Sequence, residues 1–247
     1  MIKLFVTDLD GCISHPFKTP DWEAINRIRE LNLESRKSDH IPPITLCTGR
    51  PFPYAEAVAQ WLDVRVPFIF ESAGMFSWEG YHIETALSTS DGELNPILEL
   101  KSWLKKEVIP NYPAAVLEFT KMMDAGVVCQ DLEMNEQIHQ RVLEKVGKDY
   151  PDLEVHATEI SVNILMPGND KLQGIKLLSE ALDINLDEMA YIGDSSGDVP
   201  ALKSVKMPFA PINAHQLAKN SGEVIELDTT KAVLEAYHRI IEYNRSF

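Results

Sequence analysis

The chain has 247 residues, 45% of them hydrophobic, which is enough for one large domain or for a core that carries a smaller insertion. Its formal net charge of −15, without a basic patch, argues against binding to nucleic acid or to anionic membranes, and we find neither a long uncharged apolar run nor a secretion signal. We therefore expect a cytoplasmic protein with no nucleic-acid or membrane partner.

The first eighty residues alternate between strand and helix patterns. Short apolar runs that end in polar residues are typical of buried parallel strands, and apolar positions that recur on one face indicate helices. The predicted elements, in order, are a strand at 3–8, a helix with Thr19 as N-cap and Pro20 as its first residue, a strand at 44–47, a helix at 55–62 and a strand at 67–70. This alternation favours an α/β fold, with an open parallel sheet and helices on both faces.

The pattern changes between residues 81 and 166 and then returns. In the middle part, strand patterns at 81–85, 115–120 and 126–130 and two later strands accompany helical patterns at 94–108 and 135–150. Alternation resumes with a helix from Lys171, strands at 189–193, 207–210 and 224–227, and a final helix. We therefore predict a discontinuous, Rossmann-like core formed by residues 1–80 and 167–247, with an α+β cap domain inserted at 81–166.

Asp8 and Asp10 place two carboxylates at the end of the first predicted strand. In an extended backbone, residues i and i+2 point to the same side, so the two acids repel each other unless a metal binds, a proton is shared or one group turns away. Gly11 permits a sharp turn and the close approach of an oxyanion to the backbone. A strand end with two solvated acids is the alternative explanation.

Residues suited to binding phosphate follow the second strand and begin a later helix. We expect the Thr48 hydroxyl and the Gly49 N–H at the same edge of the sheet as Asp8. Lys171, at the start of a predicted helix, would neutralise a phosphate together with the free helix N–H groups. Arg50 is a candidate substrate contact, with pairing to a carboxylate as its alternative. Taken singly, an ordinary turn and a surface lysine would explain these segments.

Asp194 and Asp198 follow the strand at 189–193. Their spacing of four residues returns both to one side of a helical turn or compact loop, and hard oxygen donors of this type suit Mg²⁺. Because the net charge of −15 opposes an anionic substrate, a divalent cation is a requirement of this interpretation. A helix N-cap with an exposed acid is the alternative.

Together, these segments resemble the haloacid dehalogenase-like (HAD) hydrolase superfamily. Its pattern is an Asp-x-Asp strand end, a Ser or Thr after the second strand, a distant Lys and a late Gly-Asp-x₃-Asp loop, and all four occur here in order. Only 37 residues separate Asp10 from Thr48, whereas 122 separate Thr48 from Lys171, so the insertion lies in the second gap. This arrangement is similar to the Cof-type (class IIB) branch, which includes sucrose-phosphate, mannosyl-3-phosphoglycerate and archaeal phosphoglycolate phosphatases and the phosphomannomutases.

The resemblance implies an Mg²⁺-dependent phosphatase of small phosphate monoesters, such as a sugar phosphate or phosphoglycolate. It implies that Asp8 attacks phosphorus and forms an aspartyl-phosphate, while Asp10 protonates the leaving oxygen and later activates water. The implied metal ligands are the Asp8 and Asp194 carboxylates and the Asp10 main-chain carbonyl, with Asp198 bound directly or through water. The implied phosphate-binding residues are Gly11, Thr48, Gly49 and Lys171.

Two other functions stay open from the sequence. A phosphomutase of the phosphomannomutase type needs the same aspartyl-phosphate but returns the phosphate to a bound sugar. A non-catalytic, metal-dependent binding protein would use the same residues without turnover. The sequence does not specify an oligomeric state.

Overall fold

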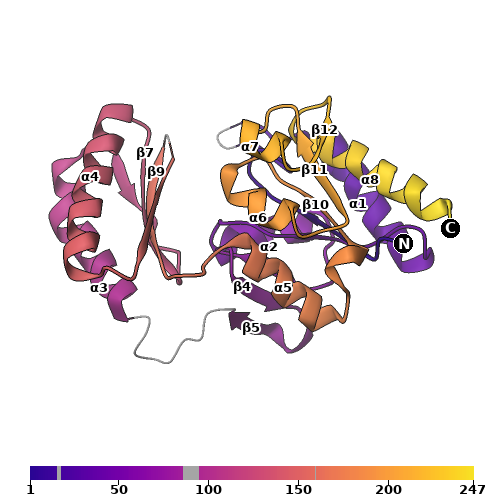
Figure 1. The fold of residues 1–247 in the computed structure, drawn as a ribbon, viewed down its shortest axis with the longest axis horizontal. Helices are drawn as coiled ribbons and strands as arrows, with labels where there is room; N and C mark the ends of the chain where they lie inside the picture. Colours follow the sequence, from indigo (N-terminus) through magenta and orange to yellow (C-terminus); the bar gives the residue numbers. More distant parts are fainter. Residues whose placement is uncertain (16–17, 86–94, 159) are drawn as a thin grey trace. The chain divides into compact units, whose positions relative to one another are not determined.

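The computed structural model describes residues 1–15, 18–85, 95–158 and 160–247, and the chain divides into two compact units (Figure 1). Unit 1 consists of Met1–Ala86 and Asp170–Phe247, and unit 2 of Leu87–Asn169. Each unit has a hydrophobic core of its own. Among the described residues, no helix combines the length and the apolar character needed to cross a membrane.

A five-stranded parallel sheet forms the centre of unit 1, in the order β12-β11-β10-β1-β2. Every residue of β1 and β10 is buried, because a sheet covered on both faces needs apolar residues on each side. The strands are β1 (Leu4–Thr7), β2 (Ile44–Leu46), β10 (Met189–Ile192), β11 (Met207–Pro211) and β12 (Glu223–Ile225). The predicted α/β fold with a parallel central sheet is confirmed.

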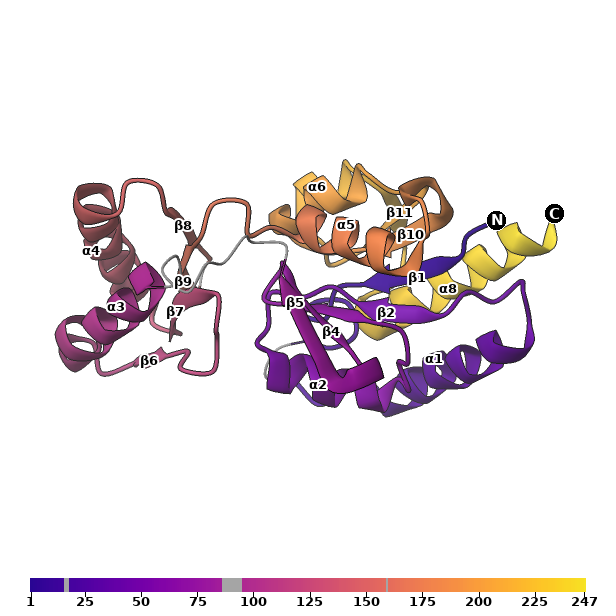
Figure 2. The same ribbon diagram turned by 90° about the horizontal axis from the view of Figure 1, so that it is seen from below.

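Helices cover both faces of this sheet. Helices α1 and α8 pack together on one face, and α5 and α6 lie on the other (Figure 2). The α-helices described in unit 1 are α1 (Trp22–Glu34), α2 (Phe52–Trp61), α5 (Lys171–Leu182), α6 (Val199–Leu202), α7 (Gln216–Lys219) and α8 (Thr229–Arg245). Short 3₁₀ segments lie at Ser35–Lys37, Glu79–Tyr81, Leu186–Glu188 and Ser196–Asp198.

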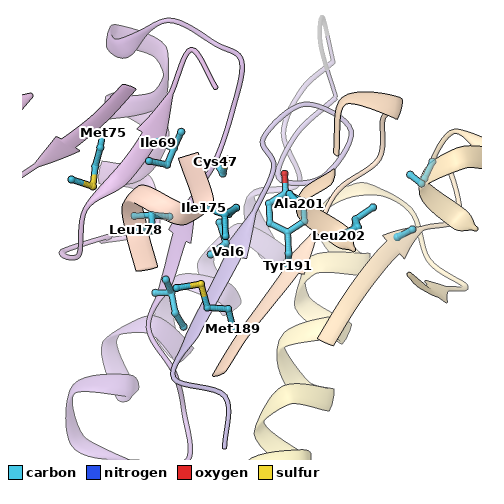
Figure 3. Packing of buried hydrophobic residues seen from close by; sticks show 14 residues of the cluster. Val6, Cys47, Ile69, Met75, Ile175, Leu178, Met189, Tyr191, Ala201 and Leu202 are labelled. Carbon is cyan, nitrogen blue, oxygen red and sulfur yellow. The ribbon is translucent and has the colours of Figure 1, made fainter. Parts of the chain in front are cut away.

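One core cluster of unit 1 joins the sheet to α5 and α6 (Figure 3). Val6 of β1 and Met189 of β10 pack there with Ile175 and Leu178 of α5. Tyr191 of β10 is the largest side chain in the cluster and is fully buried. The packing of α5 on the sheet therefore fixes the position of this helix relative to the residues that follow the strands.

The first helix begins later than predicted. Asp21, not Thr19, is the N-cap, because its carboxylate accepts a hydrogen bond from the Ala24 N–H at 3.1 Å, and Trp22 is the first helical residue. A carboxylate at this position satisfies an N–H that the helix leaves without a partner. The predicted cap was wrong because Thr19 and Asp21, two residues apart, are both suitable N-cap residues.

A smaller antiparallel sheet extends unit 1. Its strands are β3 (Phe68–Phe70), β4 (Gly74–Ser77) and β5 (His82–Thr85), and a parallel bridge between Cys47 and Ile69 links it to the main sheet. The sequence placed residues 81–85 in the inserted module. The structure places β5 in unit 1 because β5 pairs with β4 along its whole length.

Unit 2 is an α+β arrangement. A four-stranded antiparallel sheet, in the order β6-β7-β9-β8, packs against α3 and α4. Buried Ile138, Val142 and Val146 recur along α4 and share a core with the strands. The elements are α3 (Asn95–Trp103), a π-helical segment (Leu104–Val108), a 3₁₀ segment (Ile109–Asn111), β6 (Ala115–Leu117), β7 (Asp124–Cys129), α4 (Leu132–Asp149), β8 (Glu154–Ala157) and β9 (Ser161–Leu165). The predicted start of the first of these helices, residue 94, lies outside the described residues.

Candidate active site

The candidate site lies at the carboxyl ends of two adjacent strands. Strands β1 and β10 pair in parallel up to Thr7 and Ile192, so the residues after both strands emerge at one edge of the sheet. Asp8 follows β1 directly, and its N–H donates to the Ile192 carbonyl at 2.9 Å, while Asp194 lies two residues beyond β10. The chain continues to β2 on one side of this pair and to β11 on the other, and ligands of open α/β sheets bind at such a point.

Lys171, the first residue of α5, joins two carboxylates. Its Nζ lies 2.8 Å from Asp8 Oδ2 and 2.5 Å from Asp198 Oδ1, and all three residues are buried. Burial opposes the charge of Lys171, but the charges of Asp198 and Asp8 outweigh burial and raise its pKa well above its ordinary value. Lys171 is therefore a fixed positive charge inside the site.

Asp8 is harder to keep ionised. Burial raises its pKa well above the ordinary range, Lys171 opposes this shift, and repulsion from Asp198 and Asp194 adds to it. Its Oδ1 accepts a hydrogen bond from the Leu9 N–H at 2.7 Å. Since Lys171 alone does not offset these effects, a further cation at this place would favour the ionised form of Asp8.

Asp198 is fully buried, and donors surround both of its oxygen atoms. Oδ1 accepts hydrogen bonds from Lys171 Nζ at 2.5 Å and from the Tyr191 hydroxyl at 2.6 Å. Oδ2 accepts from the Ser195 N–H at 2.8 Å and the Ser195 hydroxyl at 2.5 Å. Burial opposes ionisation, but Lys171, Ser195 and Tyr191 outweigh it and lower the pKa of Asp198. A carboxylate has about four lone-pair positions, so these donors leave little room for a metal ion on Asp198 itself.

One carboxylate oxygen from each of Asp8, Asp194 and Asp198 lies within 4.8 Å of the other two. Burial and the charge of Asp198 raise the pKa of Asp194 to about 6. Gly11 makes room for this carboxylate: its φ is +71°, and a Cβ there would overlap with the Asp194 side chain. Asp8 and Asp194 are hard oxygen donors beside the Lys171–Asp198 ion pair, and this pair of carboxylates fits a divalent cation such as Mg²⁺.

Asp10 pairs with Arg50. Arg50 Nε donates to Asp10 Oδ2 at 2.5 Å, and Nη2 donates to Oδ1 at 3.2 Å, which is a bidentate arrangement. The guanidinium also lies over the Tyr54 ring, 5.3 Å from its centroid. The side chains of Arg50 and Asp10 are 30% and 31% exposed, so a ligand can reach the pair. Of the two roles that the sequence left open for Arg50, pairing with a carboxylate is the one seen here.

Thr48 and Gly49 follow β2, the neighbour of β1. Thr48 is buried, and its Oγ1 accepts a hydrogen bond from the Arg50 N–H at 3.1 Å, which orients the hydroxyl. The Gly11 N–H donates to the Ser14 carbonyl at 2.7 Å, so in this conformation it serves the turn. Of the predicted phosphate-binding residues, Gly11, Thr48 and Gly49 thus follow the ends of adjacent strands, whereas Lys171 begins α5.

Three residues that the sequence analysis did not single out help to hold the site. Ser195 forms a capping box with Asp198, and the Ser-x-x-acid pattern is a signal that could have found it. Asn213 Nδ2 donates to the Gly11 carbonyl at 2.9 Å, and its Oδ1 accepts from the Thr229 N–H at 2.9 Å. The third residue is Tyr191, which lies in an apolar strand where nothing in the sequence indicates a partner for its hydroxyl.

Comparisons with known proteins agree with this architecture. The family model of haloacid dehalogenase-like hydrolases matches residues 81–236. The chain is similar to a phosphoglycolate phosphatase of Methanopyrus kandleri, at 25% identity over 91% of this chain and 90% of that protein. It is also similar to a phosphoglycolate phosphatase of Halorubrum lacusprofundi, at 26% identity over 93% and 92% of the two chains. A solved haloacid dehalogenase-like hydrolase of Bacteroides thetaiotaomicron shares the fold, with a TM-score of 0.73, 17% identity, and coverage of 97% of this chain and 100% of that one.

Proposed function

Since the chain belongs to the haloacid dehalogenase-like hydrolase family, as a phosphatase of that type, we propose that it uses Mg²⁺ and an aspartyl-phosphate to hydrolyse small phosphorylated metabolites. The observation that carries the proposal is the buried Lys171 ammonium between Asp8 and Asp198, with the Asp194 carboxylate close by. A carboxylate in such a place acts as a nucleophile toward phosphorus when positive charge surrounds both partners.

Asp8 supplies the attacking oxygen in the proposed reaction. A bond forms between a carboxylate oxygen of Asp8 and phosphorus, the bond from phosphorus to the leaving oxygen breaks, and Asp10 gives the leaving oxygen a proton. Water then attacks the phosphorus of the aspartyl-phosphate while Asp10 takes a proton from the water. Orthophosphate leaves, and the Asp8 carboxylate is restored.

We propose that the Asp8 and Asp194 carboxylates and the Asp10 main-chain carbonyl hold the metal ion. When bound, Mg²⁺ would offset the charges of the phosphate and of the acidic residues, so that an anion can attack an anion. Asp198 would act on the metal through water, because both of its oxygens already accept hydrogen bonds, and it anchors Lys171.

The substrate phosphate is assigned to donors from three segments. Thr48, Gly49 and Lys171 hold its oxygens, and Gly11 lets it approach the backbone closely. Arg50 exchanges its bonds to Asp10 for bonds to the substrate, which frees Asp10 for proton transfer. This exchange is supported by the partial exposure of the Arg50–Asp10 pair.

The relatives named phosphoglycolate phosphatases support a small phosphate monoester, such as phosphoglycolate or a sugar phosphate, as the substrate. We propose that unit 2 is the cap domain that selects this substrate, in a cytoplasmic enzyme.

The test is orthophosphate release from a panel of sugar phosphates, phosphoglycolate and mononucleotides, with and without Mg²⁺. Asp8→Asn keeps the size of the side chain but removes the nucleophile, so we expect kcat to fall by a factor of at least about 10⁴. Asp187→Asn, which neutralises an exposed acid, should keep the parent rate. Undiminished turnover by purified Asp8→Asn contradicts the mechanism.

The same panel separates the two other functions. A phosphomutase would convert a sugar phosphate to its isomer without releasing orthophosphate. A non-catalytic binding protein would bind Mg²⁺ but would cleave no member of the panel, nor para-nitrophenyl phosphate when this is added to it.

A further inference from the structure

A buried hydroxyl contacts the candidate active site from within the core. Tyr191 is fully buried on β10, and its ring packs in the core cluster shown in Figure 3. Its hydroxyl donates to Asp198 Oδ1 at 2.6 Å. Lys171 Nζ donates to the same oxygen atom at 2.5 Å. Two donors therefore share one carboxylate oxygen.

Lys171 is also shared. Its Nζ lies 2.5 Å from Asp198 Oδ1 and 2.8 Å from Asp8 Oδ2. The ammonium therefore interacts both with Asp198 and with Asp8, the proposed nucleophile. A carboxylate oxygen accepts about two hydrogen bonds, and each donor reduces the attraction of that oxygen for the other. Without the Tyr191 hydroxyl, Asp198 Oδ1 would attract Lys171 more strongly, and Nζ would move away from Asp8.

We propose that Tyr191 is a positioning residue of this enzyme. Its hydroxyl limits the attraction of Asp198 for Lys171, and so keeps the ammonium within reach of Asp8 and of a phosphoryl oxygen bound there. The proposal rests on the proposed phosphatase function. Its rival is a purely structural role, in which the Tyr191 hydroxyl is a buried polar group that needs any acceptor.

Tyr237 offers a matched control. It is also fully buried, and its hydroxyl donates to the Pro42 carbonyl at 2.6 Å. Pro42 precedes β2, so this hydrogen bond lies at the amino end of the sheet, opposite to the residues that follow the strands. Tyr191→Phe and Tyr237→Phe each remove one buried hydrogen bond of the same length without changing the packing of the ring.

We expect the two variants to lose similar stability in urea unfolding but to differ in kinetics. Tyr191→Phe should lower kcat about tenfold with KM within about twofold, because the interaction of Lys171 with Asp8 matters most during attack. Tyr237→Phe should retain the parent kcat and KM. Equal kcat values in the two variants would overturn the proposal.

A double-mutant cycle tests the route through Asp198. If Tyr191 acts through this residue, Tyr191→Phe should change kcat much less in an Asp198→Asn background than in the parent. Losses that simply multiply would show that Tyr191 acts by another route.

Crystal structures of the parent and of both variants decide the matter without any activity. The distance from Lys171 Nζ to Asp8 Oδ2 should lengthen in Tyr191→Phe and stay unchanged in Tyr237→Phe, and an unchanged distance in Tyr191→Phe overturns the proposal. A parent protein that releases no orthophosphate would refute the proposed function, whereas this distance would still report on Tyr191.

Discussion

Gly11 and Gly80 both have positive φ angles, of 71° and 69°, but their surroundings differ. A Cβ at Gly11 would overlap with the Asp194 carboxylate, whereas a Cβ at Gly80 would meet no atom within 4 Å. Gly11→Ala and Gly80→Ala should each cost about 1 kcal/mol, because both force a side chain into left-handed backbone.

Only Gly11→Ala should also displace Asp194. We expect this variant to need an Mg²⁺ concentration about 10- to 100-fold higher than the parent for half-maximal phosphatase activity. The measurement is the initial rate against Mg²⁺ concentration for the parent and both variants, with thermal unfolding alongside. If Gly11→Ala keeps the parent's Mg²⁺ requirement, Asp194 is not a metal ligand of the kind proposed.

The residues of the site differ in how far the sequence could predict their contacts. Asp8 and Asp194 could be placed together because the ends of adjacent parallel strands share an edge, and Lys171 could be added as the first residue of a predicted helix. The sequence could not predict whether Arg50 pairs with Asp10 or contacts the substrate, because the pairing depends on side-chain rotamers and on the neighbouring Tyr54 ring. The Tyr191 hydroxyl was missed because a tyrosine within an apolar strand has the same pattern as any core aromatic.

Helix α8 is fastened to the start of β1 by Asn244. Its Oδ1 accepts from the Ile2 N–H at 2.7 Å, and its Nδ2 donates to the carbonyls of Ile2 at 2.8 Å and His40 at 3.2 Å. Asn244→Ala leaves these buried backbone groups without partners, so we expect a loss of about 2–4 kcal/mol in the free energy of unfolding. Because the contact lies at the amino end of β1, kcat and KM of the folded enzyme should not change.

Urea unfolding of Asn244→Ala and Asn220→Ala provides the comparison. Asn220 is exposed and accepts a hydrogen bond from Gln216 at 2.8 Å, so its substitution should change stability by less than about 0.5 kcal/mol. Similar losses in the two variants would show that Asn244 does not fasten the helix in this way.

The strands and helices were more predictable than their ends and partners. Continuous apolar runs marked β1 and β10 because both faces of the sheet are covered. The start of α1 was misplaced because Asp21 and Thr19 are both good caps. β5 belongs to unit 1 because it forms hydrogen bonds with β4. An alternating pattern predicts a strand but does not predict which strand it pairs with.

The protein as a whole carries a formal charge of −15, and part of this charge is concentrated in the buried site. Burial and Asp198 raise the pKa of Asp194 to about 6, and burial raises that of Asp8, although Lys171 opposes it. The metal-free folded state therefore binds these protons more tightly than the unfolded chain. The contribution of Asp194 to stability falls as pH rises from about 4 through 6, and that of Asp8 falls with rising pH in the same direction. The pKa of Asp198 is lowered, so the ionised form of this residue stabilises the folded state. This stabilisation is lost only in stronger acid, as pH falls through the pKa of Asp198.

Mg²⁺ should therefore stabilise the protein more at pH 8 than at pH 5, where protons on Asp194 compete with the metal. We expect saturating Mg²⁺ to raise the midpoint of thermal unfolding by on the order of 5 °C at pH 8 and by clearly less at pH 5. Asp194→Asn should remove this increment, whereas Asp187→Asn, at an exposed position, should keep it. An increment that is equal at both pH values would contradict the role of Asp194.

The position of β1 between β10 and β2 has a consequence for biosynthesis. Leu4 pairs with Met189, so most of the chain must leave the ribosome before β1 acquires its second neighbour. The Leu87–Asn169 unit, which has a hydrophobic core of its own, is by then fully synthesised, while β1 still lacks its partner β10. We therefore expect nascent chains that stall before β10 is synthesised to be prone to aggregation through the unpaired edge of β1.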